Sequence, residues 1–308
     1  MVRGHRPEVA AHAKCPVMRL SRSMSRAFTL VELLVVIAIV ALLITLSLPL
    51  LSRAKAIGKQ CKELAAGKQL LTAFAMYADA SKGLVLTGYP TRSMVSGPIV
   101  VRNDQGLRLT GEDAQRYPWR LAPWLDYNFK GLYGDDQLLS QVREGRDRYA
   151  QFGVSYEYVV SLFPSLGMNV AFVGGSERFN AFDRLFRARY GKVFIERAEE
   201  AVRPSRQIVF ASARCEEQAL APELGRPDGF FRVEPPRFLS SQGVRWESAY
   251  LEGSEAPGIN SGFVSIRNLR RAVVAQMDGS GSTLDWDQLQ DMTRWSNAAT
   301  SSEWSLGG

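Results

Sequence analysis

The sequence predicts an α+β protein in which a long N-terminal helix packs on a C-terminal globular head with an antiparallel β-sheet. Three observations lead to this prediction. Residues 28–51 are almost entirely apolar, residues 52–79 repeat apolar side chains at helical spacing, and residues 84–308 mix short strand and helix patterns with turns. The chain has 308 residues, of which 46% are hydrophobic, so it can form one to three domains with a substantial core.

The first predicted element is a helix that can span a membrane. Residues 33–44 are uninterrupted apolar residues, and with their apolar neighbours they reach the roughly 20 residues that cross a bilayer as a helix. Arg22 and Arg26 precede this segment, so the positive-inside rule predicts a cytoplasmic N-terminus and export of the remainder. We therefore expect a single-pass membrane protein whose transmembrane part is residues 28–51.

Glu32 is the unusual residue of this segment. A carboxylate four residues into a membrane helix costs about 2.5–3.5 kcal/mol on insertion, and this cost is offset only where the carboxylate meets a cation. A free amine on Phe28 of a neighbouring copy, exposed by cleavage after Ala27, would be such a cation. We therefore interpret Glu32 as an assembly residue that sets the stagger between adjacent helices.

Residues 52–79 extend the helix beyond the apolar segment. Gly58 and Gly67 weaken it locally, and Lys82-Gly83 is a stop signal. Together the two parts predict one helix of roughly 50 residues, about 75 Å long. Its predicted packing face is an apolar stripe with spacings of three, four or seven residues, formed by Ile57, Cys61, Leu64, Leu71, Phe74 and Tyr77.

The head is predicted to contain short elements separated by turns. An aromatic, proline-interrupted loop at residues 117–124 is interpreted as packed core, and residues 221–258 as a loop-rich excursion. The remaining patterns predict strands at 84–86, 99–102 and 207–212, helices at 135–149, 177–190 and 285–295, and a hairpin of 263–266 with 272–277.

Charge and histidine usage exclude several functional classes. Of the 38 basic and 31 acidic residues, six and one lie within residues 1–27, so the remainder carries a net charge of only +2 and predicts no nucleic-acid partner. Both histidines, His5 and His12, also lie in residues 1–27, which excludes His-dependent nucleophilic catalysis and His-ligated zinc from the rest. Cys61 and Cys215 form no metal or redox motif, and we favour two separately buried thiols over a disulfide. We expect neither an enzyme nor a bound cofactor.

The residues around Glu32 resemble a known N-terminal motif. The run Ala27-Phe28-Thr29-Leu30-Val31-Glu32-Leu33, after a basic leader, closely resembles the cleavage and methylation motif of type IV pilins and type II secretion pseudopilins. The resemblance implies that a prepilin peptidase cuts between Ala27 and Phe28 and N-methylates Phe28. It also implies that Glu32 is the family's membrane glutamate, that Pro49 kinks the long helix, and that the fold is pilin-like.

Two features depart from that family's pattern. Ala27 stands where the family usually has glycine, and the leader of 27 residues is longer than usual, so Met18 or Met24 is an alternative start. The predicted organisation is a leader at residues 1–27, a long helix at 28–82 and an exported head at 83–308.

The C-terminal part extends the resemblance. The stretch RNLRRAVVAQMDG, from Arg267 to Gly279, resembles an Arg-His…Asp-Gly signature of pseudopilin-like proteins abundant in Planctomycetes and Verrucomicrobia. Asn268 stands where that group usually has histidine, and an amide hydrogen-bonds but does not titrate. Asp278, Asp285 and Asp287 form a weak calcium candidate, and we favour a turn followed by a helix cap at this place.

These observations predict a structural subunit of a type II secretion pseudopilus or a type IV pilus-like filament. The large head suggests a minor subunit. Its implied partners are prepilin peptidase, other pilin or pseudopilin subunits, an inner-membrane assembly platform and the lipid bilayer. The alternative is a membrane-anchored, exported binding module that does not polymerise, held by a signal anchor. A secretory signal peptide cut near Ala54-Lys55-Ala56 is a further alternative, but neither gives Glu32 a role.

Overall fold

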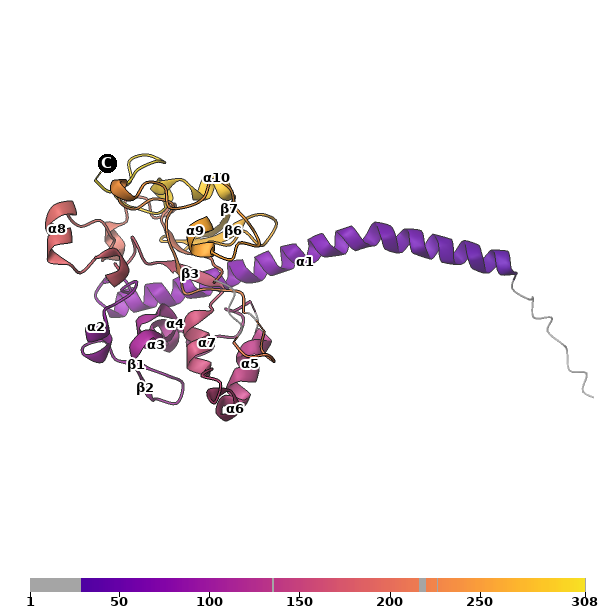
Figure 1. Ribbon diagram of the computed structural model, residues 1–308, viewed down its shortest axis with the longest axis horizontal. Helices are drawn as coiled ribbons and strands as arrows, with labels where there is room; N and C mark the ends of the chain where they lie inside the picture. Colours follow the sequence, from indigo (N-terminus) through magenta and orange to yellow (C-terminus); the bar gives the residue numbers. More distant parts are fainter. Residues whose placement is uncertain (1–28, 135, 216–219, 226, 308) are drawn as a thin grey trace, which may run out of the picture. The chain divides into compact units, whose positions relative to one another are not determined.

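A computed structural model describes residues 29–307, apart from 135, 216–219 and 226 (Figure 1). The chain divides after Leu51 into two compact units, which are described separately. Helix α1, Leu30–Ala80, begins in the first unit and ends in the second. The expected α+β fold class is confirmed, because this long helix is followed by a domain with a predominantly antiparallel sheet.

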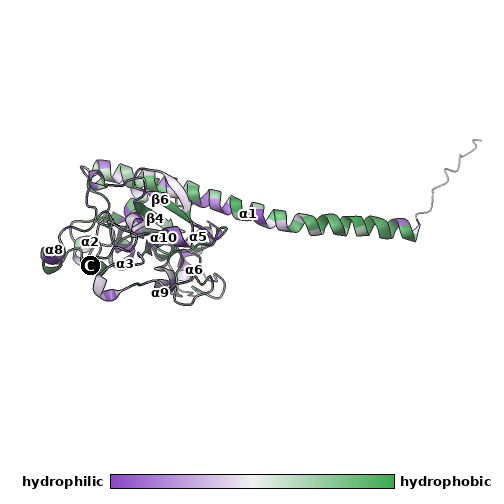
Figure 2. Cartoon of the chain, turned by 90° about the horizontal axis from the view of Figure 1, so that it is seen from above, coloured by the Kyte–Doolittle hydropathy of each residue, from purple (hydrophilic) through white to green (hydrophobic). Residues whose placement is uncertain are grey.

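In the first unit, α1 exposes every side chain from Leu30 to Leu51. Hydrophobic residues cover this part of the helix, whereas polar and hydrophobic residues mix farther along (Figure 2). The hydroxyl groups of Thr45 and Ser47 are hydrogen-bonded within the helix, because they donate to the carbonyl oxygens of Ala41 and Leu43, at 2.8 and 2.7 Å. Among the described residues, α1 is the one helix long and apolar enough to cross a membrane.

The second unit contains short helices, 3₁₀ turns and seven strands among the residues that the structure describes. Its further helices are α2 Arg92–Ser96, α3 Gly111–Gln115, α4 Tyr117–Leu121, α5 Asp136–Glu144, α6 Arg146–Ala150, α7 Tyr156–Leu162, α8 Arg184–Tyr190, α9 Pro257–Ser261 and α10 Trp286–Leu289. Its 3₁₀ turns are Ala122–Leu125, Glu177–Phe179, Ala198–Glu200, Ser240–Gln242 and Met292–Arg294. The strands are β1 Val101–Arg102, β2 Arg108–Leu109, β3 Leu166–Asn169, β4 Ile208–Ser212, β5 Arg232–Val233, β6 Ala272–Gln276 and β7 Gly281–Leu284.

The main sheet has the strand order β5-β3-β4-β6-β7. All neighbouring pairs are antiparallel except β3 with β5. Every residue of β3, β4 and β6 is buried, and successive side chains of a strand point to opposite faces. Both faces of the sheet centre are therefore covered. A separate hairpin of β1 and β2 completes the strand pairing.

The second half of α1 packs on this sheet. Its buried face begins at Glu63 and continues at helical spacing through Ala66, Leu70 and Phe74. The rings of Phe74 and Phe210 of β4 meet edge to face with centroids 6.0 Å apart. Gly67 lies against β6, because a Cβ there would lie 3.4 Å from that of Ala275.

The predicted apolar stripe of the helix is confirmed only in its C-terminal part. Leu71 and Phe74 are buried and Leu64 and Tyr77 are partly buried, as expected. The prediction is wrong for Ile57, which is 44% exposed, and for Cys61, which is also exposed, because the sheet is reached only from Glu63 onward. No disulfide joins the two described cysteines, and neither is fully buried.

Strand predictions succeed where the sequence is a buried apolar run. Residues 207–212 form β4 and 272–277 form β6, but 84–86 and 263–266 form only single bridges, and 99–102 shortens to β1. The partner of β6 in its hairpin is β7 rather than 263–266. Phe263 has φ of 67°, a left-handed conformation that interrupts a regular strand.

Three helices predicted in the head are each broken in the structure. The helix predicted at 135–149, whose first residue lies outside the described residues, divides into α5 and α6 at Gly145, where a Cβ would lie 2.5 Å from the ring of Tyr149. Residues 177–190 divide at Asn180, whose φ of 54° ends a 3₁₀ turn before α8. Residues 285–295 likewise form α10 and a 3₁₀ turn. The loop predicted at 117–124 is helical, and its interpretation as packed core is correct for residues 117–122, with Trp119 only 1% exposed, but not for the exposed Pro123.

Candidate functional site

The described part of the N-terminal motif begins at Thr29. The predicted cleavage residues, Ala27 and Phe28, lie outside the described residues. Thr29 and Glu32 form a capping box at the start of α1. The Thr29 backbone N–H donates to Glu32 Oε2 at 2.8 Å, its hydroxyl donates to the same oxygen at 2.9 Å, and the Glu32 N–H donates to Thr29 Oγ1 at 3.1 Å.

This capping box gives Glu32 a role within its own chain. It satisfies N–H groups that a helix start leaves unpaired, and it places a negative charge at the positive end of the helix dipole. Oε1 of Glu32 accepts no hydrogen bond from any described residue, and the side chain is exposed. The carboxylate therefore keeps an oxygen available for a second partner.

Pro49 lies inside α1, and the helix continues through it to Ala80. The proline removes one backbone donor from the helix ladder. Because the helix continues past Pro49 despite this loss, the proline does not end it. The kink that the resemblance implies at Pro49 stays a prediction.

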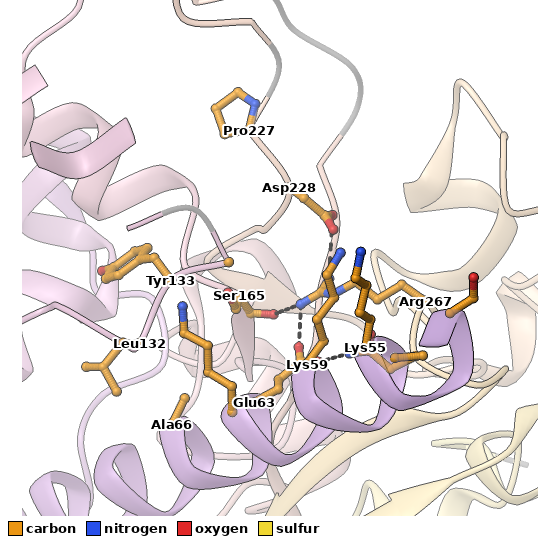
Figure 3. Close-up of a pocket in the computed structure, with 16 residues that line it drawn as sticks. Lys55, Lys59, Glu63, Ala66, Leu132, Tyr133, Ser165, Pro227, Asp228 and Arg267 are labelled. Atoms are coloured by element: carbon orange, nitrogen blue, oxygen red, sulfur yellow. Dashed lines mark hydrogen bonds and ion pairs between the residues drawn. The ribbon is translucent and has the colours of Figure 1, made fainter. Parts of the chain in front are cut away.

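The second unit contains a buried polar cluster, defined by Glu63 of α1 together with Arg267 and Asn268 (Figure 3). Asn268 Nδ2 donates to Glu63 Oε2 at 2.7 Å, and Arg267 Nη2 donates to the other oxygen, Oε1. The guanidinium also donates to the carbonyl oxygens of Ala213, at 2.6 Å, and Ser165, at 2.9 Å. The first two signature residues thus tie the long helix to the head.

Buried ion pairs such as this one generally contribute little net stability. Burial raises the pKa of Glu63, and the nearby Arg267 guanidinium and the hydrogen bond from Asn268 lower it by less. The effect of desolvation on the Glu63 carboxylate is thus larger than the effect of its ion pair with Arg267, as is common for buried pairs. The cluster fixes which residue of α1 faces the C-terminal signature.

The other two signature residues, Asp278 and Gly279, form the turn between β6 and β7. Gln276 accepts from the Gly279 N–H at 3.0 Å, and Gly279 has φ of 86°, the left-handed position of a three-residue hairpin loop. Asp278 Oδ1 accepts from the N–H and the hydroxyl of Ser280, at 2.9 and 2.6 Å. These hydrogen bonds lower the pKa of Asp278. This pair shapes a turn and lies outside the Glu63 cluster.

Two aspartates of the calcium candidate, Asp278 and Asp285, have separate local roles. Asp285 caps α10 by accepting from the Gln288 N–H at 2.9 Å, and its carboxylate lies 3.6 Å from Arg271. Within the described residues, no group of three or more His, Cys, Asp or Glu side chains is arranged to hold a metal ion. The structure therefore does not bring Asp278, Asp285 and Asp287 together as a metal site.

Comparison with known proteins decides the class of the N-terminal segment. The family model for the prokaryotic N-terminal methylation motif matches residues 22–48. These residues contain Glu32 and lead into the long apolar helix α1. The chain fits a type IV pilin-like protein. The motif indicates a structural subunit that is processed by prepilin peptidase and assembles with other pilin subunits, and the apolar helix indicates membrane anchoring. Neither the search of curated proteins nor the search of solved structures found a match.

Two functional contacts of this pilin-like chain were missed in its sequence. The Thr29-x-x-Glu32 spacing is that of a capping box, so this contact was readable. Glu63 is an acidic residue three positions before Ala66 and seven before Leu70, hence on the packing face of the helix. An acid on an apolar face signals a buried partner, but the sequence alone does not identify Arg267, 204 residues away.

Proposed function

We propose that this pilin-like chain is a minor subunit of a type II secretion pseudopilus or a type IV pilus-like filament. Prepilin peptidase cuts between Ala27 and Phe28 and methylates the new amine of Phe28. Before assembly, the subunit spans the inner membrane once, with its leader in the cytoplasm and its head exported. The observation that supports this proposal best is the methylation motif at residues 22–48, with Glu32 in the first turn of an exposed apolar helix.

The proposed assembly step follows from the chemistry of Glu32. Cleavage creates an amine on Phe28, four residues before Glu32, and a neighbouring subunit brings its own Phe28 amine to the Glu32 carboxylate. In the apolar phase an ion pair is far stronger than in water, and an unpaired carboxylate is excluded or protonated. Oε1 of Glu32, which accepts from no described residue, suits this second partner, since Thr29 occupies only Oε2.

The capping box makes a sharp test possible. Glu32→Gln keeps an acceptor for the Thr29 N–H but removes the charge, whereas Thr29→Ala removes a capping hydroxyl but keeps the charge. Filaments are sheared from cells and probed for the subunit, and mass spectrometry of the N-terminus reports cleavage and methylation. We expect Glu32→Gln to be processed but lost from filaments, and Thr29→Ala to be processed and incorporated.

The opposite pattern, assembly of Glu32→Gln and failure of Thr29→Ala, would assign Glu32 to helix capping alone. If the wild-type chain is never found in sheared filaments and its leader remains attached, the chain is a membrane-anchored module that does not polymerise. A methylated Phe28 in the same experiment excludes that alternative.

A further inference from the structure

A cavity of about 550 Å³ lies beside the Glu63 cluster (Figure 3). Its walls are the start of the second unit's part of α1, the loop at residues 131–134, Ser165, residues 227–228 and the Arg267-Asn268 pair. All of these residues belong to the second unit. The cavity is large enough for a small organic ligand.

The charge of the cavity wall is predominantly positive. Lys55, Lys59, Lys62 and Arg267 line it, against the acids Glu63 and Asp228. Lys62 is neutralised by Asp136 of α5 at 2.7 Å, and Arg267 bonds both acids of the wall. Lys55 and Lys59 have no acidic partner among the described residues. They are four residues apart and so lie on one face of α1, which is also the face of Glu63.

Ser165 provides an independent sign of a missing ligand. The residue is only 4% exposed and lines the cavity, and its hydroxyl has no hydrogen-bond partner in the part of the chain that the structure describes. Its carbonyl oxygen is occupied by Arg267 at 2.9 Å. A buried hydroxyl without a partner is unfavourable, and an acceptor bound in the cavity would satisfy it.

We infer that this cavity binds a phosphoryl group carried by a short organic body, such as a glycerophosphate. The oxygens of one phosphoryl group can accept from two ammonium groups and a hydroxyl at the same time. The apolar part of the wall, with Leu132, Tyr133 and Pro227, suits the organic body. The cavity begins at Ser52, the residue that follows the apolar segment, so a phospholipid headgroup and a free phosphate ester are the two sources of this chemistry.

The test uses the full chain purified in a non-ionic detergent. Isothermal titration measures binding of glycerol 3-phosphate in solution and of phosphatidylglycerol added to the micelles. The cavity variants are Lys55→Gln/Lys59→Gln and Ser165→Ala. The matched control is Arg53→Gln/Lys68→Gln, which removes two positive charges from exposed positions of the same helix outside the cavity.

We expect the double cavity variant to bind about tenfold more weakly or worse and Ser165→Ala to bind several-fold more weakly. The control is expected to bind within about twofold of wild type. Binding of both probes supports a phosphoryl site as such, and binding of phosphatidylglycerol alone supports the lipid source. The inference is overturned if neither probe binds, or if the control loses as much affinity as the cavity variants. None of these outcomes depends on filament assembly.

Discussion

The Glu63 cluster leads to an asymmetric prediction, because its two charged members differ in burial. The Glu63 side chain is 5% exposed and that of Arg267 is 20% exposed. Arg267→Met leaves a buried carboxylate and removes the donors to the carbonyl oxygens of Ala213 and Ser165. We expect this variant to lose about 3–5 kcal/mol of unfolding free energy, the usual cost of leaving a buried charge unpaired.

Glu63→Gln should cost much less, about 1 kcal/mol or below. Burial already raises the pKa of Glu63, so the fold accepts a neutral side chain there more readily than a charged one. The glutamine oxygen still accepts from Arg267, and the Asn268 amide can turn to accept from the new NH₂ group. The Arg267 guanidinium keeps its two carbonyl partners.

The assay is urea unfolding of the full chain in detergent, followed by tryptophan fluorescence, since Trp119 and Trp295 are buried. The double variant Glu63→Leu/Arg267→Met should be more stable than Arg267→Met alone, because it leaves no unpaired charge. Lys62→Gln is the control, since it breaks an exposed ion pair and should cost less than about 1 kcal/mol. If Glu63→Gln is as damaging as Arg267→Met, or the double variant is no more stable than Arg267→Met, the reasoning is refuted.

Three further predictions concern the same fold. The free energy of unfolding of wild type, measured relative to Glu63→Gln, should fall as pH rises from the ordinary glutamate pKa through the raised pKa of the folded state. The reason is that the folded state binds the Glu63 proton more tightly than the unfolded state does. A relative rise of this free energy in urea titrations between pH 4 and 8 would contradict the prediction. Gly58→Ala should stabilise the exposed helix by about 0.5–1 kcal/mol, since nothing lies within 4 Å of the new Cβ. Gly167→Ala should instead be strongly destabilising, because its Cβ would lie 2.5 Å from the Arg232 carbonyl carbon. Chelation with EDTA should leave the thermal unfolding midpoint unchanged, because Asp278 and Asp285 are engaged in a turn and a cap, and a lower midpoint restored by Ca²⁺ would show a metal site.

Features encoded in neighbouring residues could be predicted from the sequence. The long helix, the buried strands β4 and β6 and the methylation motif all depend on local composition and spacing, and each is found. The turn at Asp278-Gly279 also follows from local chemistry, since glycine suits its positive φ.

Features that depend on distant residues could not be predicted. Strand β6 pairs with β4 and β7, and these pairings are not visible in the sequence of β6 itself. The strand pattern at residues 263–266 is interrupted by the left-handed Phe263. The contact of Glu63 with Arg267 exists only once the helix lies on the sheet. Likewise, Ser165 and Lys59 meet at one cavity although nothing in the sequence links them.

Gly67 and Glu63 together have a consequence for how the subunit responds to force. Both lie on the packing face of α1, one against Ala275 and the other on Arg267 and Asn268. Sliding the helix by a single residue turns this face by about 100°, which brings a larger side chain against β6 and takes the carboxylate from its donors. The two contacts fix the position of the helix along the sheet. A force applied along the helix axis should therefore move the helix and the head together as one body, rather than slide the helix past the head.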